Sequence, residues 1–413
     1  MELTAGPAPR PLAGTALTLI HAGLAPTRSA LTGRLGVTRA TVGAITGELR
    51  DLGLIVVERG DLGGGEQGRP SHRLLPDPDG PVALAAQVHP DGFSVALVGL
   101  GGAVVDRDDA RLPASADPGE ALAPAAAAAA GLLRASGRRC VGAAVAVPAA
   151  VTVPAGRAVR SLYTGWPDGA PVRDLFAAGL ARHGVPQPPG AAGGRAARAA
   201  PAVCAAVNDV NAIALAEHRH GAGRGASHLL VVVAEHRGVG GALVLGGALY
   251  TGAAGLAMEA GHVSVDARGR LCPCGNRGCL NVETDAARFL AAAGRVPAAD
   301  GVLLDEAVAV LRAGYRADRR VREAADAITA RLGLGLAGLI NVVNPDLVLL
   351  GGLHGDLLRA APGRLREAVA QGSPWGYGAR IPVEPCTLDD AALIGAAEVA
   401  WQPVLDNPAL LRT

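Results

Sequence analysis

Three cysteines and a histidine form the sharpest chemical pattern in this sequence of 413 residues. Cys272, Cys274 and Cys279 lie within eight residues, and His262 precedes the first of them by ten. One imidazole and three thiolates suit a tetrahedral Zn²⁺ ion that is closed to solvent, which is the structural type of zinc site. The alternatives are a set of buried free thiols or a redox pair. We predict a structural zinc ion bound by these four residues.

A second pattern lies near the N-terminus. Apolar residues between positions 31 and 55 are spaced for two short helices that a turn at Gly36 separates, and the second helix is expected over about 39–52. Thr27 and Thr38 each precede a helical pattern, where a hydroxyl can accept a backbone N–H and cap the helix. This arrangement is typical of a helix-turn-helix, in which the second helix enters the major groove of DNA.

The start of the second helix supplies the side chains expected to contact DNA. The first residues of a recognition helix face base edges, so Thr38, Arg39 and Thr41 are predicted there, with Arg39 as a bidentate reader of guanine. Arginines nearby are expected to contact phosphates instead. These phosphate-binding candidates are Arg28, Arg34 and Arg50.

Residues 54–58 and 71–75 are expected to form the two strands of a wing. Arg69, in a Gly-Arg-Pro sequence at the start of the returning strand, could enter a neighbouring minor groove. The alternative is a small helical packing domain with solvated arginines, because Gly43 and Gly47 lower the stability of the second helix. The combination of turn, caps, polar helix start and wing favours DNA binding.

Composition limits the wider possibilities. No lysine occurs, so all 38 basic side chains are arginines, and the formal net charge is only +1. Any affinity for nucleic acid must therefore come from a local surface. Six cysteines in a chain of this length do not form a disulfide framework. No secretory signal and no apolar run long enough to span a membrane is evident, so we expect a cytoplasmic protein without a membrane partner.

The elements that must position these residues are strands followed by helices, in two series. Such a pattern predicts an α/β body with two lobes, and the cleft between the lobes is the expected ligand site. The expected domains are 1–78 for the winged helix, 79–205 for the first lobe and 206–413 for the second, with the C-terminal helix returning to the first lobe. The segment 186–202 is expected to be a flexible excursion. Strands are expected at 82–88, 93–99, 141–147, 229–234, 241–245 and 346–350, and helices at 118–135, 209–220 and 323–341.

Four stretches resemble the ROK family, which is named for repressors, open reading frames and kinases. EAGHVSVDARGRLCPCGNRGCL (259–280) resembles the zinc signature of that family, ligand for ligand. Residues 207–225 resemble the segment that carries the catalytic Asp of the kinases, 340–352 the closing motif of the nucleotide lobe, and 141–159 the entrance of the sugar lobe. The winged helix resembles the repressor branch. The resemblance implies a winged helix-turn-helix joined to a two-lobed, actin-like and sugar-kinase-like body of the ribonuclease H-like type.

The resemblance also implies a sugar site. Asn208 matches a sugar-binding Asn, Asp209 the catalytic base, and Glu259 a sugar-binding Glu. His262 matches the residue that binds zinc with one nitrogen and can face the sugar with the other. Taken by itself, Asp209 could instead be a helix N-cap.

Departures from the family pattern bear on catalysis. The Asp-Gly-Gly-Thr phosphate turn of the kinases is replaced by residues 87–92, and the second phosphate turn by residues 235–241, which begins with bulky Glu and His. Phosphoryl transfer depends on these parts, so we expect no catalytic residue and no kinase activity. The residues expected to bind the sugar also depart from the family pattern, because Asn281 replaces a Glu and Tyr163 replaces an Asn.

We therefore predict a sequence-specific transcription regulator, expected to be a repressor, that binds a double-stranded DNA operator as a homodimer or dimer of dimers. Its body is expected to sense a sugar or sugar phosphate without phosphorylating it. The first alternative is an ATP-dependent hexose or aminosugar kinase with an added DNA-binding domain. The second alternative is a regulator whose body no longer binds sugar.

Overall fold

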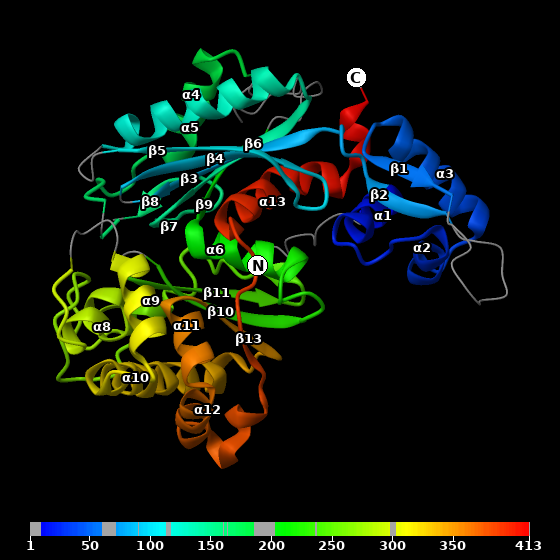
Figure 1. The fold of residues 1–413 in the computed structure, drawn as a ribbon. Helices are drawn as coiled ribbons and strands as arrows, with labels where there is room; N and C mark the ends of the chain where they lie inside the picture. Colours follow the sequence, from blue (N-terminus) through cyan, green and yellow to red (C-terminus); the bar gives the residue numbers. More distant parts are fainter. Residues whose placement is uncertain are drawn as a thin grey trace, which may run out of the picture.

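The computed structural model describes residues 10–59, 72–89, 91–112, 117–159, 161–162, 164–185, 203–235, 238–297 and 303–412. Within them, three helices and a two-stranded antiparallel sheet precede two five-stranded sheets with helices on both faces (Figure 1). The predicted α/β class is therefore confirmed.

The N-terminal elements match the predicted helix-turn-helix and wing. They are α1 (Leu12–His21), α2 (Arg28–Leu35), α3 (Arg39–Asp51), β1 (Ile55–Glu58) and β2 (Arg73–Pro76). Both predicted caps form, because the Thr27 hydroxyl accepts the N–H of Ala30 and the Thr38 hydroxyl accepts that of Thr41. Gly36 ends α2 with φ at +64°, a left-handed conformation that glycine adopts without steric cost.

The first lobe is built on a sheet with the strand order β5-β4-β3-β6-β9. β3 and β6, and β6 and β9, pair in parallel, whereas β3, β4 and β5 form an antiparallel meander. Helices α4 and α5 cover one face, and the C-terminal helix α13 covers the other (Figure 1). The bounds are β3 (Val82–His89), β4 (Gly92–Gly99), β5 (Val104–Arg111), α4 (Pro118–Ser136), β6 (Cys140–Val147), α5 (Val172–Arg182), β9 (Val203–Asn208) and α13 (Ala391–Asp406), with a small hairpin of β7 (Ala150–Val151) and β8 (Ala158–Val159).

Strand β5 was not predicted, and its sequence explains why. VVDRDDAR is exposed along its whole length and has no apolar face, so it lacks the alternation that marks a half-buried strand. It forms because β4 offers an unpaired edge, which its backbone extends.

The second lobe has the strand order β12-β11-β10-β13-β14. Helix α6 packs on one face of this sheet, and helices α7–α12 build the core on the other. The bounds are α6 (Asp209–His220), β10 (His228–Ala234), β11 (Val239–Leu245), β12 (Ala248–Leu249), η1 (Ala260–His262), α7 (Leu280–Glu283), α8 (Ala286–Ala292), α9 (Leu303–Gly314), α10 (Arg319–Val343), β13 (Leu347–Gly352), α11 (Leu353–Ala360), α12 (Pro362–Gln371), η3 (Pro374–Arg380) and β14 (Val383–Pro385), and η4 (Pro408–Leu411) follows α13.

Helix α10 is, among the described residues, the one helix that is long and apolar enough to cross a membrane. Its apolar stripe, which includes Ile328, Leu332 and Leu336, is buried in the core of the second lobe. Packing within the lobe therefore accounts for the apolar character of this helix.

Helix α13 connects the parts of the molecule. Trp401 is fully buried and its indole N–H donates to the carbonyl of Val98 in the first sheet, at 3.0 Å. The same hydrophobic cluster contains Leu17 of α1, Leu31 of α2 and Leu49 of α3. The winged helix therefore shares a core with the first lobe and with α13.

Candidate functional site

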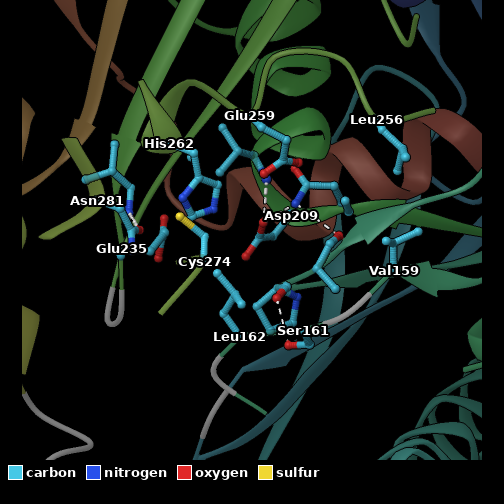
Figure 2. Close-up of a pocket in the computed structure, with 18 residues that line it drawn as sticks. Val159, Ser161, Leu162, Asp209, Glu235, Leu256, Glu259, His262, Cys274 and Asn281 are labelled. Carbon is cyan, nitrogen blue, oxygen red and sulfur yellow. Dashed lines mark hydrogen bonds between the residues drawn. The ribbon is translucent and has the colours of Figure 1, made fainter. Parts of the chain in front are cut away.

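A cavity of about 330 Å³ lies between the two lobes (Figure 2). This volume is at the lower end of the range for small-molecule sites and fits a monosaccharide. Its walls come from the end of β6, the start of α6, the turn between β10 and β11, and the loop that carries the cysteines. All four residues that the family resemblance assigned to a sugar line this cavity, namely Asn208, Asp209, Glu259 and His262.

The junction of β9 and α6 positions two of these side chains. Asn208 is the N-cap of α6, because its Oδ1 accepts the N–H of Asn211 at 3.0 Å. Its Nδ2 donates to the carbonyl of Ala149 and to Oδ1 of Asp209, at 3.2 and 3.0 Å. Asp209 is the first helical residue and also accepts the N–H of Val210 at 2.8 Å. The alternative that Asp209 caps the helix is therefore wrong, because Asn208 occupies the N-cap position.

Three carboxyl groups surround the cavity, from Asp209, Glu235 and Glu259 (Figure 2). Burial, with the nearby charges of Glu235 and Glu259, raises the pKa of Asp209 to about 7. Glu259 is an exposed residue as a whole. Desolvation of its carboxyl in the cavity nevertheless raises the pKa of that group as well. A carboxyl with a pKa near neutrality can accept a hydrogen bond from a sugar hydroxyl or donate one to it.

The predicted zinc ligands converge on one point. Their donor atoms all lie within 4.8 Å of one another. The Cys274 and Cys279 sulfurs are 3.7 Å apart, and Cys272 Sγ is 3.7 Å from His262 Nδ1. A tetrahedron with Zn–S bonds of about 2.3 Å has edges of about this length, so the residues fit a zinc ion. Cys272 and Cys279 are buried, whereas Cys274 is exposed.

The cysteine loop closes because its backbone pairs with itself. Leu271 and Arg277 form an antiparallel bridge, and so do Ser264 and Cys279. Gly278 has a φ of +62°, and a Cβ there would lie 1.8 Å from the carbonyl oxygen of Asp266. Glycine is therefore required at this position for the loop to fold back on itself.

Asn281, the departure from the family pattern, is buried in the wall between the cysteine cluster and the cavity. Its Oδ1 accepts the N–H of Val239 at 2.8 Å, and its Nδ2 lies 3.8 Å from the sulfur of Cys272. An amide can donate to a thiolate, which a carboxylate cannot do. Asn281 therefore connects the cysteine loop to the turn after β10.

A second cavity, of about 610 Å³, lies between the lobes where the two phosphate turns of a kinase would meet. The carboxyl groups of Asp91, Asp109, Glu235 and Asp390 line it. Arg107, which also lines it, forms ion pairs with both Asp109 and Asp390. This excess of carboxylates opposes a triphosphate by charge repulsion. Pro90, His236 and Arg237 of the predicted turns lie outside the described residues.

The predicted DNA-contacting residues differ in their surroundings. Arg39 is exposed on the first turn of α3. The hydroxyls of Thr38 and Thr41 lie 2.9 Å apart in a capping interaction. Arg28 is half-buried, and its Nε has no hydrogen-bond partner among the described residues. Arg69, like Tyr163 and the segment 186–202, lies outside the described residues.

Sequence reasoning missed a buried polar cluster where the winged helix meets the body. The Glu398 carboxylate on α13 contacts His21 of α1, and Arg219 and His220 of α6. A Glu in the otherwise apolar stretch AALIGAAEVAW was the available signal, because a buried carboxylate requires partners. Its partners could not be located from the sequence, since they lie far away in the chain.

These features define an α/β protein of two lobes, with a loop that could hold a metal ion beside the inter-lobe cavity, joined to three N-terminal helices and a two-stranded sheet. Residues 198–402 match the model described as the ROK family. This part of the chain therefore carries a ROK family domain, in agreement with the predicted resemblance.

The chain is similar to proteins of two kinds. It is 34% identical to a glucokinase of Thermotoga maritima over 46% of this chain and 64% of that protein. It is 26% identical to an N-acetylglucosamine repressor of Escherichia coli over 49% of this chain and 51% of that protein. The matches thus span about half to two thirds of these relatives.

Along nearly its whole length, the chain is similar in structure to a ROK family transcriptional regulator that is a homolog of the E. coli Mlc protein. The TM-score is 0.70, with 21% identity and 97% of each chain covered. At this identity the likeness shows the fold, which includes the N-terminal part of the chain as well as the body.

Proposed function

We propose that this protein is a DNA-binding transcription regulator, acting as a repressor, whose operator affinity is controlled by a sugar in the inter-lobe cavity. The observation that carries the proposal is that a helix-turn-helix with an exposed Arg39 shares its core with a body whose sugar-sized cavity is lined by several polar side chains. The similarity to an N-acetylglucosamine repressor along about half of the chain supports the same function. We place the protein in the cytoplasm, where its operator would be.

In this proposal Asn208, Asp209, Glu259 and the free nitrogen of His262 bind the sugar hydroxyls. Arg39 and Thr38 read the operator together with Thr41, while Arg28 and Arg69 contact the DNA backbone or minor groove. A zinc ion on His262 and the three cysteines would supply a fixed, closed loop that holds one wall of the cavity. The protein would bind a pseudo-palindromic operator as a homodimer or as a dimer of dimers.

The second candidate, an ATP-dependent sugar kinase, is supported by Asp209, whose place at the start of α6 and raised pKa suit a general base. It also agrees with the similarity to a glucokinase. The carboxylates in the cavity of 610 Å³ argue against it, because the ATP phosphates would have to bind among them. We therefore propose that the body binds a sugar without phosphorylating it.

One set of measurements tests this function. Purified protein is titrated by calorimetry with glucose, N-acetylglucosamine and their 6-phosphates, and an operator is selected from a random double-stranded DNA pool. Operator affinity is then measured at fixed salt with and without each sugar that binds. We expect a change of about 5- to 150-fold, which is the usual range of allosteric coupling. Phosphorylation of a sugar with ATP would favour the kinase, and an operator affinity indifferent to every bound sugar would contradict the regulation.

A further inference from the structure

We infer that the buried Glu398 couples the inter-lobe cavity to the winged helix, as a positioning residue that connects α6 to α1 through α13. The inference rests on the proposed function and names the route of its regulation. Helix α6 belongs to the body, α1 belongs to the DNA-binding domain, and α13 is the C-terminal helix. All three meet at the carboxylate of Glu398.

Helix α6 reaches from the cavity to the winged helix. Its N-terminus carries Asn208 and Asp209, which line the cavity. Its last turn carries Arg219 and His220, which contact Glu398. At a rise of 1.5 Å per residue, the two ends are about 16 Å apart. A ligand that shifts the start of this helix therefore shifts its end, because a helix moves largely as a rigid element.

The Glu398 side chain is fully buried and has partners from two other helices. His21 Nε2 of α1 lies 2.8 and 2.9 Å from its two oxygens, and His220 Nε2 of α6 lies 2.7 Å from Oε1. The Arg219 guanidinium forms an ion pair with Oε2 and also donates to Gln402. These partners hold the pKa of Glu398 well below its usual value, so that the carboxylate stays charged despite its burial.

The hydrogen-bond network assigns one tautomer to His21. The backbone N–H of Gly101 donates to His21 Nδ1 at 2.9 Å, so the ring proton must lie on Nε2 and is donated to Glu398. A metal ion on His21 Nε2, for which His220 and Glu398 lie within reach, would require a doubly deprotonated ring. The cluster is therefore a directional contact between helices rather than a metal site.

The helices of this route are packed backbone against backbone. A Cβ at Gly395 of α13 would lie 1.7 Å from the carbonyl oxygen of Ala212 in α6. A Cβ at Gly14 of α1 would lie 2.3 Å from the carbonyl oxygen of Asp406 at the end of α13. Contacts this close leave no free volume, so a displacement of α6 is transmitted to α13 and α1 rather than absorbed.

Other polar contacts between the winged helix and the body lie at the surface. Arg10 pairs with Asp406 at 2.6 Å, and Arg412 of the C-terminus pairs with Glu48 of α3 at 2.7 Å. Both pairs are solvated, with Arg412 62% exposed, so each contributes little. Arg412 therefore provides a matched control, because it crosses the same junction without belonging to the buried cluster.

The test compares Glu398→Gln and His21→Ala with Arg412→Ala and the wild type. Sugar affinity is measured by calorimetry, with whichever of glucose and N-acetylglucosamine binds the wild-type protein. Operator affinity is measured with and without that sugar. We expect sugar affinity to stay at the wild-type value in every variant. The ratio of the two operator affinities should fall toward 1 in Glu398→Gln and His21→Ala and stay at the wild-type value in Arg412→Ala.

A loss of stability alone would not produce this separation of sugar affinity from operator response. If Glu398→Gln does not fold, His21→Ala still decides the outcome, because it leaves Glu398 paired with Arg219 and His220. If sugar changes the operator affinity of Glu398→Gln and His21→Ala as strongly as that of a responsive wild type, this inference is wrong and the proposed function stands. A wild-type operator affinity that no bound sugar changes overturns the proposed function and, with it, the route.

Discussion

The position of Asp209 in the fold determines both its hydrogen bonds and its ionisation. It begins α6, accepts the N–H of Val210, and faces two other carboxyl groups across the cavity. Its raised pKa follows from burial first and from the charge of Glu235 second. The protein thus keeps a carboxyl in its binding cavity that is partly protonated near neutral pH.

This arrangement predicts a pH dependence of stability. The pKa of Asp209 is about 7 in the folded protein and about 3.9 in an unfolded chain, so the folded state binds more protons between these values. The contribution of Asp209 to the free energy of unfolding is full below about pH 4 and is lost as the pH rises to about 7. Asp209→Asn should remove this slope, whose upper limit is about 1.4 kcal/mol per pH unit for one titrating group.

Urea denaturation at constant ionic strength, at several pH values between about 4 and 7, measures the effect. Glu323→Gln is the control, because it removes an exposed carboxyl that pairs only within α10. If the free energy of unfolding changes with pH equally in the wild type and in Asp209→Asn, Asp209 titrates as an ordinary carboxyl and the prediction is wrong.

The four side chains of the proposed zinc site give a second prediction at the residue scale. Wild-type protein purified without chelator should contain about one zinc ion per chain. Cys279→Ser should lose the metal and lower the thermal midpoint, because metal affinity contributes directly to the folding of such a loop. Elemental analysis and a thermal scan measure both. Cys386→Ser, a cysteine outside the cluster, should leave the metal content unchanged, and wild-type protein without zinc would contradict the proposed site.

At the scale of elements, α3 depends on its N-cap. The Thr38 hydroxyl bonds to the Thr41 hydroxyl and accepts the backbone N–H of Thr41, which fixes the start of the helix beside the exposed Arg39. The opposite side of α3 is buried through Val42, Ile45 and Leu49. Packing and capping together present Arg39 in one direction, which a specific contact with a base requires.

Arg39→Ala should weaken operator binding by about 1–3 kcal/mol and relax specificity at one base position. Arg34→Ala, an exposed arginine of α2, should weaken binding to all sequences alike and reduce the dependence on salt. Both effects are measured by fluorescence anisotropy, with the selected operator and its single-base variants, over a range of salt concentrations. Equal losses on every sequence for Arg39→Ala would make this residue a phosphate contact.

At the scale of the molecule, the proposed operator requires two copies of the chain, and one surface suits their contact. Trp375 of η3 is 98% exposed and Val342 at the end of α10 is 83% exposed. The two segments are joined, because Asn341 Nδ2 donates to the carbonyl of Gly372 and the Tyr377 hydroxyl donates to Asn344. Exposed apolar side chains on neighbouring segments are typical of a protein interface.

If the proposed dimer forms through this surface, Trp375→Arg combined with Val342→Arg should convert it to a monomer and weaken operator binding. Light scattering after size-exclusion chromatography gives the mass. Val296→Arg is the control, since Val296 is 89% exposed but lies in a different part of the lobe. A dimer that persists in the double variant would place the interface elsewhere.

The sequence by itself determined the features that depend on neighbours in the chain. The helix caps at Thr27 and Thr38, the turn at Gly36 and the cluster of His262 with three cysteines each follow from local spacing. Most predicted strands and helices also agree with the structure, because their apolar periodicity reflects which face is buried.

Only the tertiary structure decided the features that join distant segments. Glu235 and Asn281 complete the cavity from separate elements, and β5 exists because β4 offers it an edge. Glu398 meets His21 across 377 residues of chain. No local pattern specifies such a contact, because the free energy of a buried carboxylate depends on which donors the fold brings to it.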